Sequence, residues 1–250
     1  MKKVVYGHRG APAERPENTL EGFACALEAG ADALETDVHL TSDGAVVIAH
    51  DDTGERCCRE PARVDATPLA ALRRWNAGAT HPRARGEHRV PTLAEALDAF
   101  PTAFFNIDVK PRDGGAAAAV VRVVRERAAG ERVRLTSFFS SNVRAVRALG
   151  HANTGLGLSE VVLLRALPLA VLERLAPRGN AAQIPTHQGP LRLDGAGFIA
   201  KCHAVGVRVD YWTIDDPAEA ARLFALGADG VVTNDPRAIV PVARAYRAQE

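Results

Sequence analysis

The chain has 250 residues, of which 47% are apolar and 24% are charged, so it can bury a large core and does not have the composition of a disordered protein. Its formal net charge of +1 gives no reason to expect nucleic acid or an anionic membrane as a partner. No stretch approaches the ~20 apolar residues of a membrane helix, and the apolar run behind the two N-terminal lysines is too short for a signal peptide, so we expect a cytoplasmic protein without stable membrane insertion.

Short apolar runs alternate with helix patterns along the chain. The first helix is predicted at 18–30, with Asn18 or Thr19 as its N-cap and Gly30 at its end. Further helices are predicted at 114–130, 140–150, 159–176, 194–206, 216–227 and 235–249. Pro168 should break the helix at 159–176. The strands between these helices are predicted to be parallel, because each is followed by a segment long enough for a crossover.

One segment departs from this alternation. The sequence TSDG at 41–44 separates two strand patterns, 32–38 and 45–50, and leaves no room for a crossover helix. These two strands should therefore form an antiparallel hairpin. If TSDG is the turn, facing positions sum to about 85, which would place Glu35 opposite His50. A slip of one or two residues in the register would still leave His50 folded back beside the carboxylates.

Eight parallel strands remain once the second strand of the hairpin is set aside. They are predicted at 3–7, 32–38, 103–109, 133–137, 153–158, 181–184, 207–213 and 229–233. Eight strands alternating with helices in 250 residues predict a TIM (β/α)8 barrel, with the β-hairpin after its second strand. A doubly wound open sheet is the alternative, but no GxGxxG sequence follows the first strand to favour it.

The segment 51–90 is irregular and rich in Arg, Pro, Gly and Cys, with a short helix near 68–75. We expect it to be a small insertion over the C-terminal face of the barrel, within a single catalytic domain of residues 1–250. Two of the four cysteines, Cys57 and Cys58, are adjacent there, and no CxxC pair occurs, which favours reduced thiols over a disulfide or a metal site.

The ends of the predicted strands carry the polar residues that a barrel uses for function. Strand 3–7 is followed by His8 and Arg9. Strand 32–38 carries Glu35 and Asp37, two apart and therefore on one face. Strand 103–109 carries Asp108, and Lys110 follows it.

Three neighbouring carboxylates repel one another unless a cation lies between them. Glu35, Asp37 and Asp108 offer hard oxygen ligands, which suit Mg²⁺ or Ca²⁺ better than zinc. We therefore expect one divalent cation there, with Mn²⁺ as a further candidate. Surface carboxylates paired with arginines are the alternative.

Two histidines, His8 and His50, should lie beside this cluster and could act as general base and general acid. Arg9 and Lys110 would add fixed positive charge for a phosphate. Such a combination suits cleavage of a phosphodiester. The remaining histidines, His39 among them, are expected to have packing or hydrogen-bonding roles.

The same residues occur in motifs that resemble those of the glycerophosphodiester phosphodiesterase family. The motifs, in the order of the family, are HRG at 8–10, PENT at 16–19, ETDVHLTSDG at 35–44, HD at 50–51, VPTLAEAL at 90–97, NIDVK at 106–110, YWTID at 211–215 and GADGVVTNDP at 227–236. Each motif alone is weakly specific, but eight in order over nearly the whole chain are specific.

The resemblance implies a TIM barrel that hydrolyses glycerophosphodiesters, as small-molecule substrates, to sn-glycerol 3-phosphate and an alcohol with a divalent metal. It implies metal ligation by the three carboxylates, acid–base catalysis by the two histidines, and phosphate binding by Arg9 and Lys110. It further implies that Glu17 lies at the rim of the site and that Trp212 lines the glycerol pocket.

The sequence departs from the family's usual motifs at two positions. Asp108 stands where the family usually has Glu, so the cation must lie closer to that strand or be reached through water. Asp215 stands where the family usually has Asn. It would favour a cationic headgroup if it points into the site, and would otherwise cap the helix that begins near Pro217.

Two other functions remain open. A phospholipase D-like enzyme acting on lysophospholipids or sphingolipids would need an apolar entry to the site, and 51–90 contains few apolar residues to provide one. The other is a degenerate barrel that keeps the fold and binds phosphodiesters but does not cleave them. The sequence gives no indication of the oligomeric state.

Overall fold

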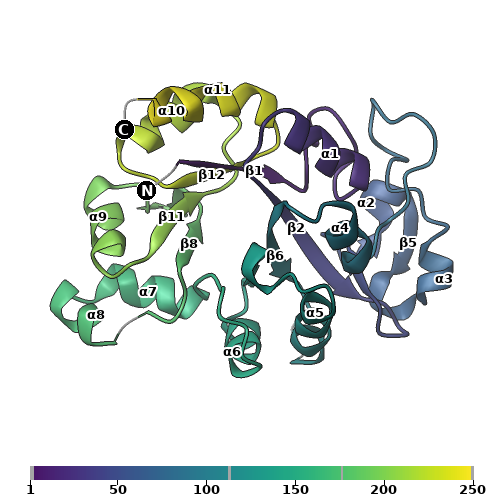
Figure 1. Cartoon of the computed structure of the whole chain (residues 1–250), viewed down its shortest axis with the longest axis horizontal. Helices are drawn as coiled ribbons and strands as arrows, with labels where there is room; N and C mark the ends of the chain where they lie inside the picture. Colours follow the sequence, from purple (N-terminus) through teal and green to yellow (C-terminus); the bar gives the residue numbers. More distant parts are fainter. Residues whose placement is uncertain (1–2, 112–113, 176, 249–250) are drawn as a thin grey trace.

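Seven parallel strands curl into a sheet with helices around its outside in the computed structural model of the chain (Figure 1). The structure describes residues 3–111, 114–175 and 177–248. The strand order is β7–β6–β2–β1–β12–β11–β8. The bounds are Val4–His8 for β1, Ala33–Leu40 for β2, Phe104–Val109 for β6, Val133–Thr136 for β7, Ala181–Ile184 for β8, Arg208–Tyr211 for β11 and Gly230–Thr233 for β12. The fold is a TIM-like α/β barrel, which confirms the predicted class.

The strand predicted at 153–158 is present only as two isolated parallel bridges. Thr154 pairs with Leu135 of β7, and Gly155 pairs with Ala181 of β8. Backbone hydrogen bonds from Gly155 N to Leu135 O (3.1 Å) and from Leu156 N to Ala181 O (2.8 Å) support them. This short segment therefore connects the two ends of the curled sheet and completes the ring.

Helices follow most strands at the positions that the sequence predicts. Their bounds are Leu20–Glu28 for α1, Leu93–Ala99 for α4, Gly114–Glu126 for α5, Ser140–Ala148 for α6, Leu158–Ala166 for α7, Leu169–Leu175 for α8, Ala196–Ala204 for α9, Pro217–Ala225 for α10 and Pro236–Arg247 for α11. Thr19 is the N-cap of α1, and Pro168 separates α7 from α8. Ala176 and Gln249, which end two predicted helices, lie outside the described residues.

The predicted hairpin is present, but its register is shifted by one residue from the prediction. Strand β3 (Val46–Ile48) runs antiparallel to β2, with Val38 opposite Ile48 and Leu40 opposite Val46, so that facing positions sum to 86. Glu35 is therefore not paired with His50, and the shift of one residue lies within the range that the prediction allowed. The last backbone hydrogen bond of the pair runs from Ala49 N to Asp37 O (3.1 Å), and His50 lies just beyond it.

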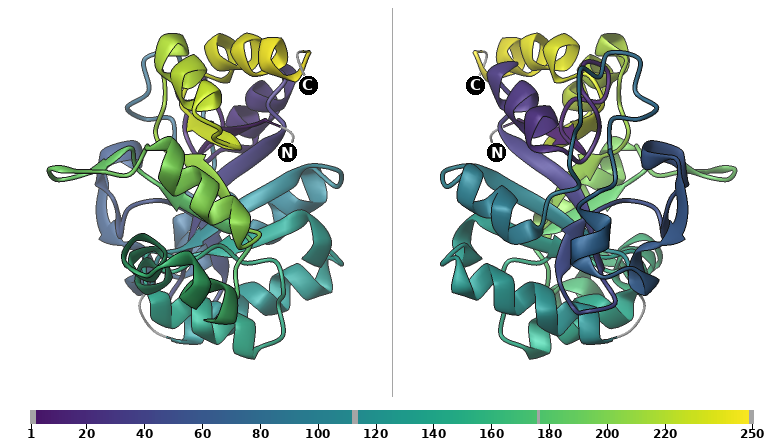
Figure 2. Two further views of the ribbon diagram at one scale, coloured as in Figure 1. Left: turned by 90° about the vertical axis from the view of Figure 1, so that its left-hand side faces the viewer. Right: turned by 90° about the vertical axis from the view of Figure 1, so that its right-hand side faces the viewer.

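Residues 51–90 form short elements at one side of the barrel (Figure 1). They are β4 (Thr53–Gly54), α2 (Glu55–Cys58), β5 (Glu60–Arg63), the 3-10 helix Val64–Ala66 and α3 (Leu69–Leu72). An apolar cluster that includes Val64, Leu72 and Trp75 packs them onto Val47 of β3. A second hairpin, β9 (His187–Gln188) with β10 (Leu191–Arg192), projects from the molecule as the green loop in Figure 2.

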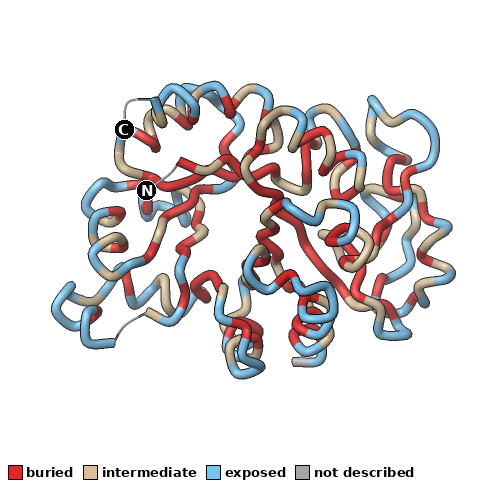
Figure 3. The backbone as a smooth tube through the Cα atoms, in the orientation of Figure 1, coloured by how far each residue is buried: buried red, intermediate tan, exposed pale blue. Residues whose placement is uncertain are grey.

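Burial follows the layers of the fold (Figure 3). The sheet strands are buried along most of their length, whereas the helices bury one side and expose the other. All four cysteines are free thiols. Within the described residues, no helix has the length and apolarity that crossing a bilayer requires.

A buried polar network lies among the strands of the barrel. Asp210 is fully buried and is 2.7 Å from Arg208 Nη2 and 3.5 Å from Arg134 Nη1. The Tyr6 hydroxyl donates to Asp210 Oδ2 (3.2 Å) and accepts from Arg134 Nη1 (2.9 Å). One carboxylate thus compensates two arginines that the fold removes from water.

We expect Asp210→Ala to lower the free energy of unfolding by about 3–5 kcal/mol, because it leaves the buried guanidinium of Arg134 without its ion-pair partner. Urea denaturation followed by circular dichroism measures the change. Asp65→Ala is the control, because it removes an exposed ion pair with Arg63 and should leave the midpoint almost unchanged. Equal midpoints for both variants would contradict the importance of the buried network.

Candidate active site

The predicted polar residues meet at the carboxyl ends of β1, β2 and β6. The strand register places His8 beside Glu35, and Asp37 beside Asp108. These four residues, with His50, line one cavity of about 650 Å³. The juxtaposition follows from the parallel sheet, since parallel strands end at one edge and residues two apart on β2 share a face.

The carboxylates are buried and their negative charges are only partly compensated. Burial raises the pKa of Glu35 well above its usual range, and the charges of Asp37 and Asp108 raise it further. Burial also raises the pKa of Asp108, against the opposing effect of Lys110. Asp37 is only 2% exposed. The site therefore holds more negative charge than its neighbours balance.

Lys110 lies between two of these carboxylates. Its ammonium is 2.8 Å from Asp37 Oδ1 and 2.7 Å from Asp108 Oδ2. Burial would lower the pKa of Lys110, but the two carboxylates raise it above its usual range. Lys110 thus compensates the carboxylates in this structure, while its predicted contact with phosphate stays a prediction.

The donor chemistry of the cluster fits a hard divalent cation. Within the described ranges, no three Asp, Glu, His or Cys side chains form a ready-made metal site. However, Asp108 Oδ1 is buried without a hydrogen-bond partner, and Glu35 has the unmet charge described above. Oxygen donors of this kind are the ligands that Mg²⁺ and Ca²⁺ prefer. A bound cation would compete with Lys110 for the same oxygens.

Asn106 also belongs to the cluster, although it is not among the residues predicted from the sequence. It pairs with Glu35 in the register of β2 and β6, lines the cavity and is 2% exposed. Its Oδ1 is buried and has no hydrogen-bond partner. Asn106 lies two residues before Asp108 on the same strand, so the sequence already places both side chains on one face and could have identified Asn106 as a site residue.

His8 is held through one ring nitrogen, which leaves the other toward the carboxylates. Its Nδ1 is 2.7 Å from Asn234 Oδ1, and its Nε2 is 3.9 Å from Glu35 Oε2. Burial and the charge of Arg9 lower the pKa of His8. Asn234, which follows β12, was not predicted as a site residue.

Asp215 contacts Asn234 and has neither of the roles expected from the sequence. Its carboxylate accepts hydrogen bonds from the backbone and the side-chain amide of Asn234, both at 2.7 Å. Helix α10 is instead capped by Asp216, which accepts from Ala218 N (2.9 Å). The residue after Asp215 therefore supplies the cap, and Asp215 is free to bind the segment after β12.

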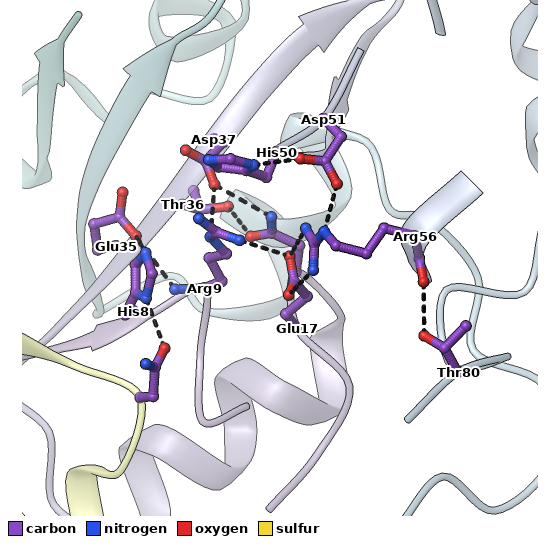
Figure 4. A network of polar contacts seen from close by, with 12 residues as sticks. His8, Arg9, Glu17, Glu35, Thr36, Asp37, His50, Asp51, Arg56 and Thr80 are labelled. Carbon is purple, nitrogen blue, oxygen red and sulfur yellow. Dashed lines mark hydrogen bonds and ion pairs between the residues drawn. The ribbon is translucent and has the colours of Figure 1, made fainter. Parts of the chain in front are cut away.

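His50 is held by residues that begin the segment 51–90 (Figure 4). Its Nδ1 is 2.7 Å from Asp51 Oδ1, and Asp51 Oδ2 accepts from Arg56 Nε (2.6 Å). Arg56 also donates two hydrogen bonds to Glu17, at 2.6 and 2.8 Å. Burial would raise the pKa of Glu17, but the hydrogen bonds from Arg56 and the charge of Arg9 lower it to about 2.

Arg9 joins this network to the carboxylates. Its backbone N donates to Glu35 O (2.8 Å), and its guanidinium contacts Glu17 (3.0 Å) and Asp37 (3.4 Å). Arg9 and Gly10 both have left-handed backbone conformations, with φ of 52° and 95°. Gly10 packs closely on Gly22. A Cβ atom added to residue 10 would lie 2.6 Å from the carbonyl carbon of Gly22, which explains why the HRG motif has glycine at this position.

The remaining predicted residues lie around the cavity or support it. Trp212 lines the cavity and is 38% exposed, whereas Glu17 lies behind Arg9 and does not line it. His39 is buried, and its Nε2 is 3.2 Å from His50 O, so it has a supporting position as expected.

The wall of the cavity away from the carboxylates is mostly apolar, although Arg165 of α7 and two glutamines, Gln183 and Gln188, also line the cavity. Helix α7 contributes Leu158, Val161 and Val162. Loops at the ends of β7 and β8 and the β9–β10 hairpin contribute further apolar lining residues, namely Phe138, Phe139, Pro185 and Leu191. The cavity thus has one charged end and one apolar side, which the composition of 51–90 did not indicate.

Comparisons with known proteins agree with this arrangement. The model of the Glycerophosphoryl diester phosphodiesterase family matches residues 8–238. The chain is 28% identical to the glycerophosphodiester phosphodiesterase of Caldanaerobacter subterraneus subsp. tengcongensis, covering 98% of this chain and 99% of that protein. It is also 28% identical to mouse lysophospholipase D GDPD1, covering 92% of this chain and 82% of that one.

Solved structures show the same fold. The crystal structure of a putative glycerophosphoryl diester phosphodiesterase from Silicibacter pomeroyi has a TM-score of 0.82 and 25% identity, covering 98% of this chain and 94% of that one. A phosphodiesterase from Oleispira antarctica, solved in complex with the product sn-glycerol-3-phosphate, also has a TM-score of 0.82 and 25% identity, covering 97% of both chains. Because the family model spans nearly the whole chain and includes the residues gathered around the cavity, this chain belongs to the glycerophosphoryl diester phosphodiesterase family.

Proposed function

We propose that the protein hydrolyses glycerophosphodiesters to sn-glycerol 3-phosphate and an alcohol, with a divalent cation and with His8 and His50 as the proton-transferring pair. One observation carries this proposal. Both imidazoles line the cavity that contains the buried carboxylates, and each has its Nδ1 engaged by a neighbour. Each Nε2 is therefore the nitrogen available for substrate.

Each of the two half-reactions requires two proton transfers. The glycerol hydroxyl next to the phosphate attacks phosphorus and forms a new P–O bond, while one histidine accepts the hydroxyl proton. The bond from phosphorus to the alcohol then breaks, and the other histidine gives that oxygen a proton. Water opens the resulting cyclic phosphate with the two roles reversed, which restores both histidines.

The partners of the two histidines support different first roles. His8 bonds to a neutral amide, and its lowered pKa favours the free base, so it would accept the first proton. His50 bonds to the Asp51 carboxylate, whose negative charge complements a protonated imidazole. His50 would therefore protonate the leaving alcohol.

Glu35, Asp37 and Asp108 would hold the cation, which we propose to be Mg²⁺ or Ca²⁺, with Mn²⁺ as a third candidate. The bound ion would neutralise phosphate charge and stabilise the charge that develops on its oxygens. Arg9 would add a fixed positive charge on the same side of the cavity. A barrel that only binds phosphodiesters is less well supported, because it would have no need for two oriented histidines.

A lysophospholipid is a second candidate substrate, and the apolar cavity wall favours it. Chains attached to glycerol could lie along α7 while the phosphodiester occupies the charged end. The sequence predicts no apolar entry in the segment 51–90. The apolar lining of the cavity comes instead from α7 and the neighbouring loops. One similar protein is named lysophospholipase D, which agrees with this alternative.

The test of the main proposal is release of sn-glycerol 3-phosphate from glycerophosphocholine. EDTA should abolish release, and Mg²⁺, Ca²⁺ or Mn²⁺ should restore it. His50→Ala should lower kcat by at least about 100-fold, because the leaving alcohol loses its proton donor. His187→Ala, an exposed histidine in the β9–β10 hairpin, is the control and should keep full activity. Metal-independent turnover, or full activity of His50→Ala, would contradict the site assignment.

The lipid alternative is tested with lysophosphatidylcholine. The double variant Leu158→Ser/Val162→Ser removes apolar surface from the wall and should raise KM for this lipid by about tenfold, with KM for glycerophosphocholine unchanged. Leu149→Ser is the control, because Leu149 is exposed but does not line the cavity. An enzyme that cleaves glycerophosphocholine but not lysophosphatidylcholine would rule the lipid substrate out.

A further inference from the structure

A chain of short hydrogen bonds leads from the surface to His8. Asp215 Oδ2 accepts from Asn234 Nδ2 at 2.7 Å, and Asn234 Oδ1 lies 2.7 Å from His8 Nδ1. Asp215 Oδ1 also accepts from the backbone N of Asn234 (2.7 Å) and from the Thr233 hydroxyl (2.9 Å). Three donors, one from the last residue of β12 and two from Asn234, are thus bound to one carboxylate.

This arrangement determines which way the Asn234 amide faces. An ionised carboxylate only accepts hydrogen bonds, so the amide group that faces Asp215 must be the NH₂. The amide oxygen must then face His8. The reverse orientation would place two acceptor oxygens 2.7 Å apart, which is repulsive.

The amide orientation in turn determines the tautomer of His8. An amide oxygen cannot donate, so His8 must carry its proton on Nδ1 to make the 2.7 Å bond. In the neutral imidazole, the lone pair then lies on Nε2. Nε2 is the nitrogen on the side of Glu35, where the cavity and the carboxylates lie.

We propose that Asp215 and Asn234 are positioning residues that hold His8 as its Nδ1–H tautomer, so that Nε2 can accept the proton of the attacking hydroxyl. The proposal rests on the proposed function for its catalytic consequence, but the tautomer itself is independent of activity. Neither residue touches the reacting atoms. Asp215 acts only through Asn234, and Asn234 acts only through His8.

His50 reaches the same tautomer by a different route, because its Nδ1 faces the Asp51 carboxylate directly. Asp51 is in turn held by Arg56. His8 has a neutral amide between its ring and the carboxylate of Asp215. The Asn234 amide is oriented by Asp215 and in turn orients the His8 ring. It does so without placing a negative charge against the imidazole, and this suits His8, which must begin the reaction as a base.

The direct test is the tautomer of His8, read from its imidazole ¹⁵N chemical shifts and long-range ¹H–¹⁵N couplings at a pH where the ring is neutral. The wild-type protein should show a single Nδ1–H form, with and without added Mg²⁺. An Nε2–H form in the wild-type protein would overturn the proposal, whatever the enzyme's activity.

Exchanging the two side chains separates positioning from general stability. In Asp215→Asn, Thr233 and the Asn234 backbone N–H keep the amide oxygen, so the new NH₂ group faces the Asn234 side chain. The Asn234 amide should then turn its own NH₂ toward His8, which should shift His8 toward the Nε2–H form and lower kcat at least about tenfold with KM little changed. Asn234→Asp alone should be more damaging, because it places two carboxylates against each other. The double exchange Asp215→Asn/Asn234→Asp should restore the Nδ1–H form of the neutral ring but only part of kcat, because His8 then faces a carboxylate in place of a neutral amide. In that variant the new carboxylate at position 234 accepts from His8, and the new amide at position 215 donates to this carboxylate.

Asp216→Asn is the matched control. It changes the neighbouring carboxylate in the same way, but asparagine also caps helices well, so both the tautomer and kcat should stay as in the wild type. A single Nδ1–H form and an unchanged kcat in Asp215→Asn would overturn the proposal. If the wild-type protein does not hydrolyse glycerophosphocholine but His8 is still in the Nδ1–H form, the proposed function is refuted. The proposal that Asp215 and Asn234 position His8 is not.

Discussion

The site is organised around negative charge that the barrel buries at the ends of β2 and β6. Glu35, Asp37 and Asp108 are brought together by the register of two parallel strands, which fixes the spacing of their backbone positions. Burial makes their repulsion costly. Lys110 and Arg9 reduce that cost but do not remove it, since the pKa of Glu35 stays raised and Asp108 Oδ1 has no partner. A cluster in this state is suited to receive a cation and, through it, a phosphate.

The neighbouring side chains are arranged so that the histidines keep their orientation beside this charge. A network of Glu17, Arg56 and Asp51 connects the HRG segment to His50 and links the segment 51–90 to the barrel (Figure 4). Asp215 and Asn234 do the same for His8 from the segments that follow β11 and β12. Both imidazoles therefore present Nε2 to one cavity, although their supports come from different parts of the chain.

Much of this could be predicted from the sequence, because strand and helix patterns are local. The four residues TSDG leave no room for a crossover and therefore predict the hairpin. Glu35 and Asp37 lie two apart on one strand and therefore predict two carboxylates on one face. The register of the hairpin was off by one, since a turn motif limits facing positions without determining them. The strand at 153–158 has a strand-like sequence but makes only two bridges between β7 and β8. The contact between Asp215 and Asn234 and the apolar lining from α7 depend on the packing of distant segments, which no local pattern contains.

Whether the buried carboxylates form a cation site is tested most directly by a crystal structure of the protein grown with Mn²⁺. We expect one anomalous peak in contact with Glu35, Asp37 and Asp108, with the Lys110 ammonium moved away from at least one of the two carboxylates that it now contacts. A map without a peak at this position at millimolar Mn²⁺, with Lys110 still between Asp37 and Asp108, would contradict a cation site.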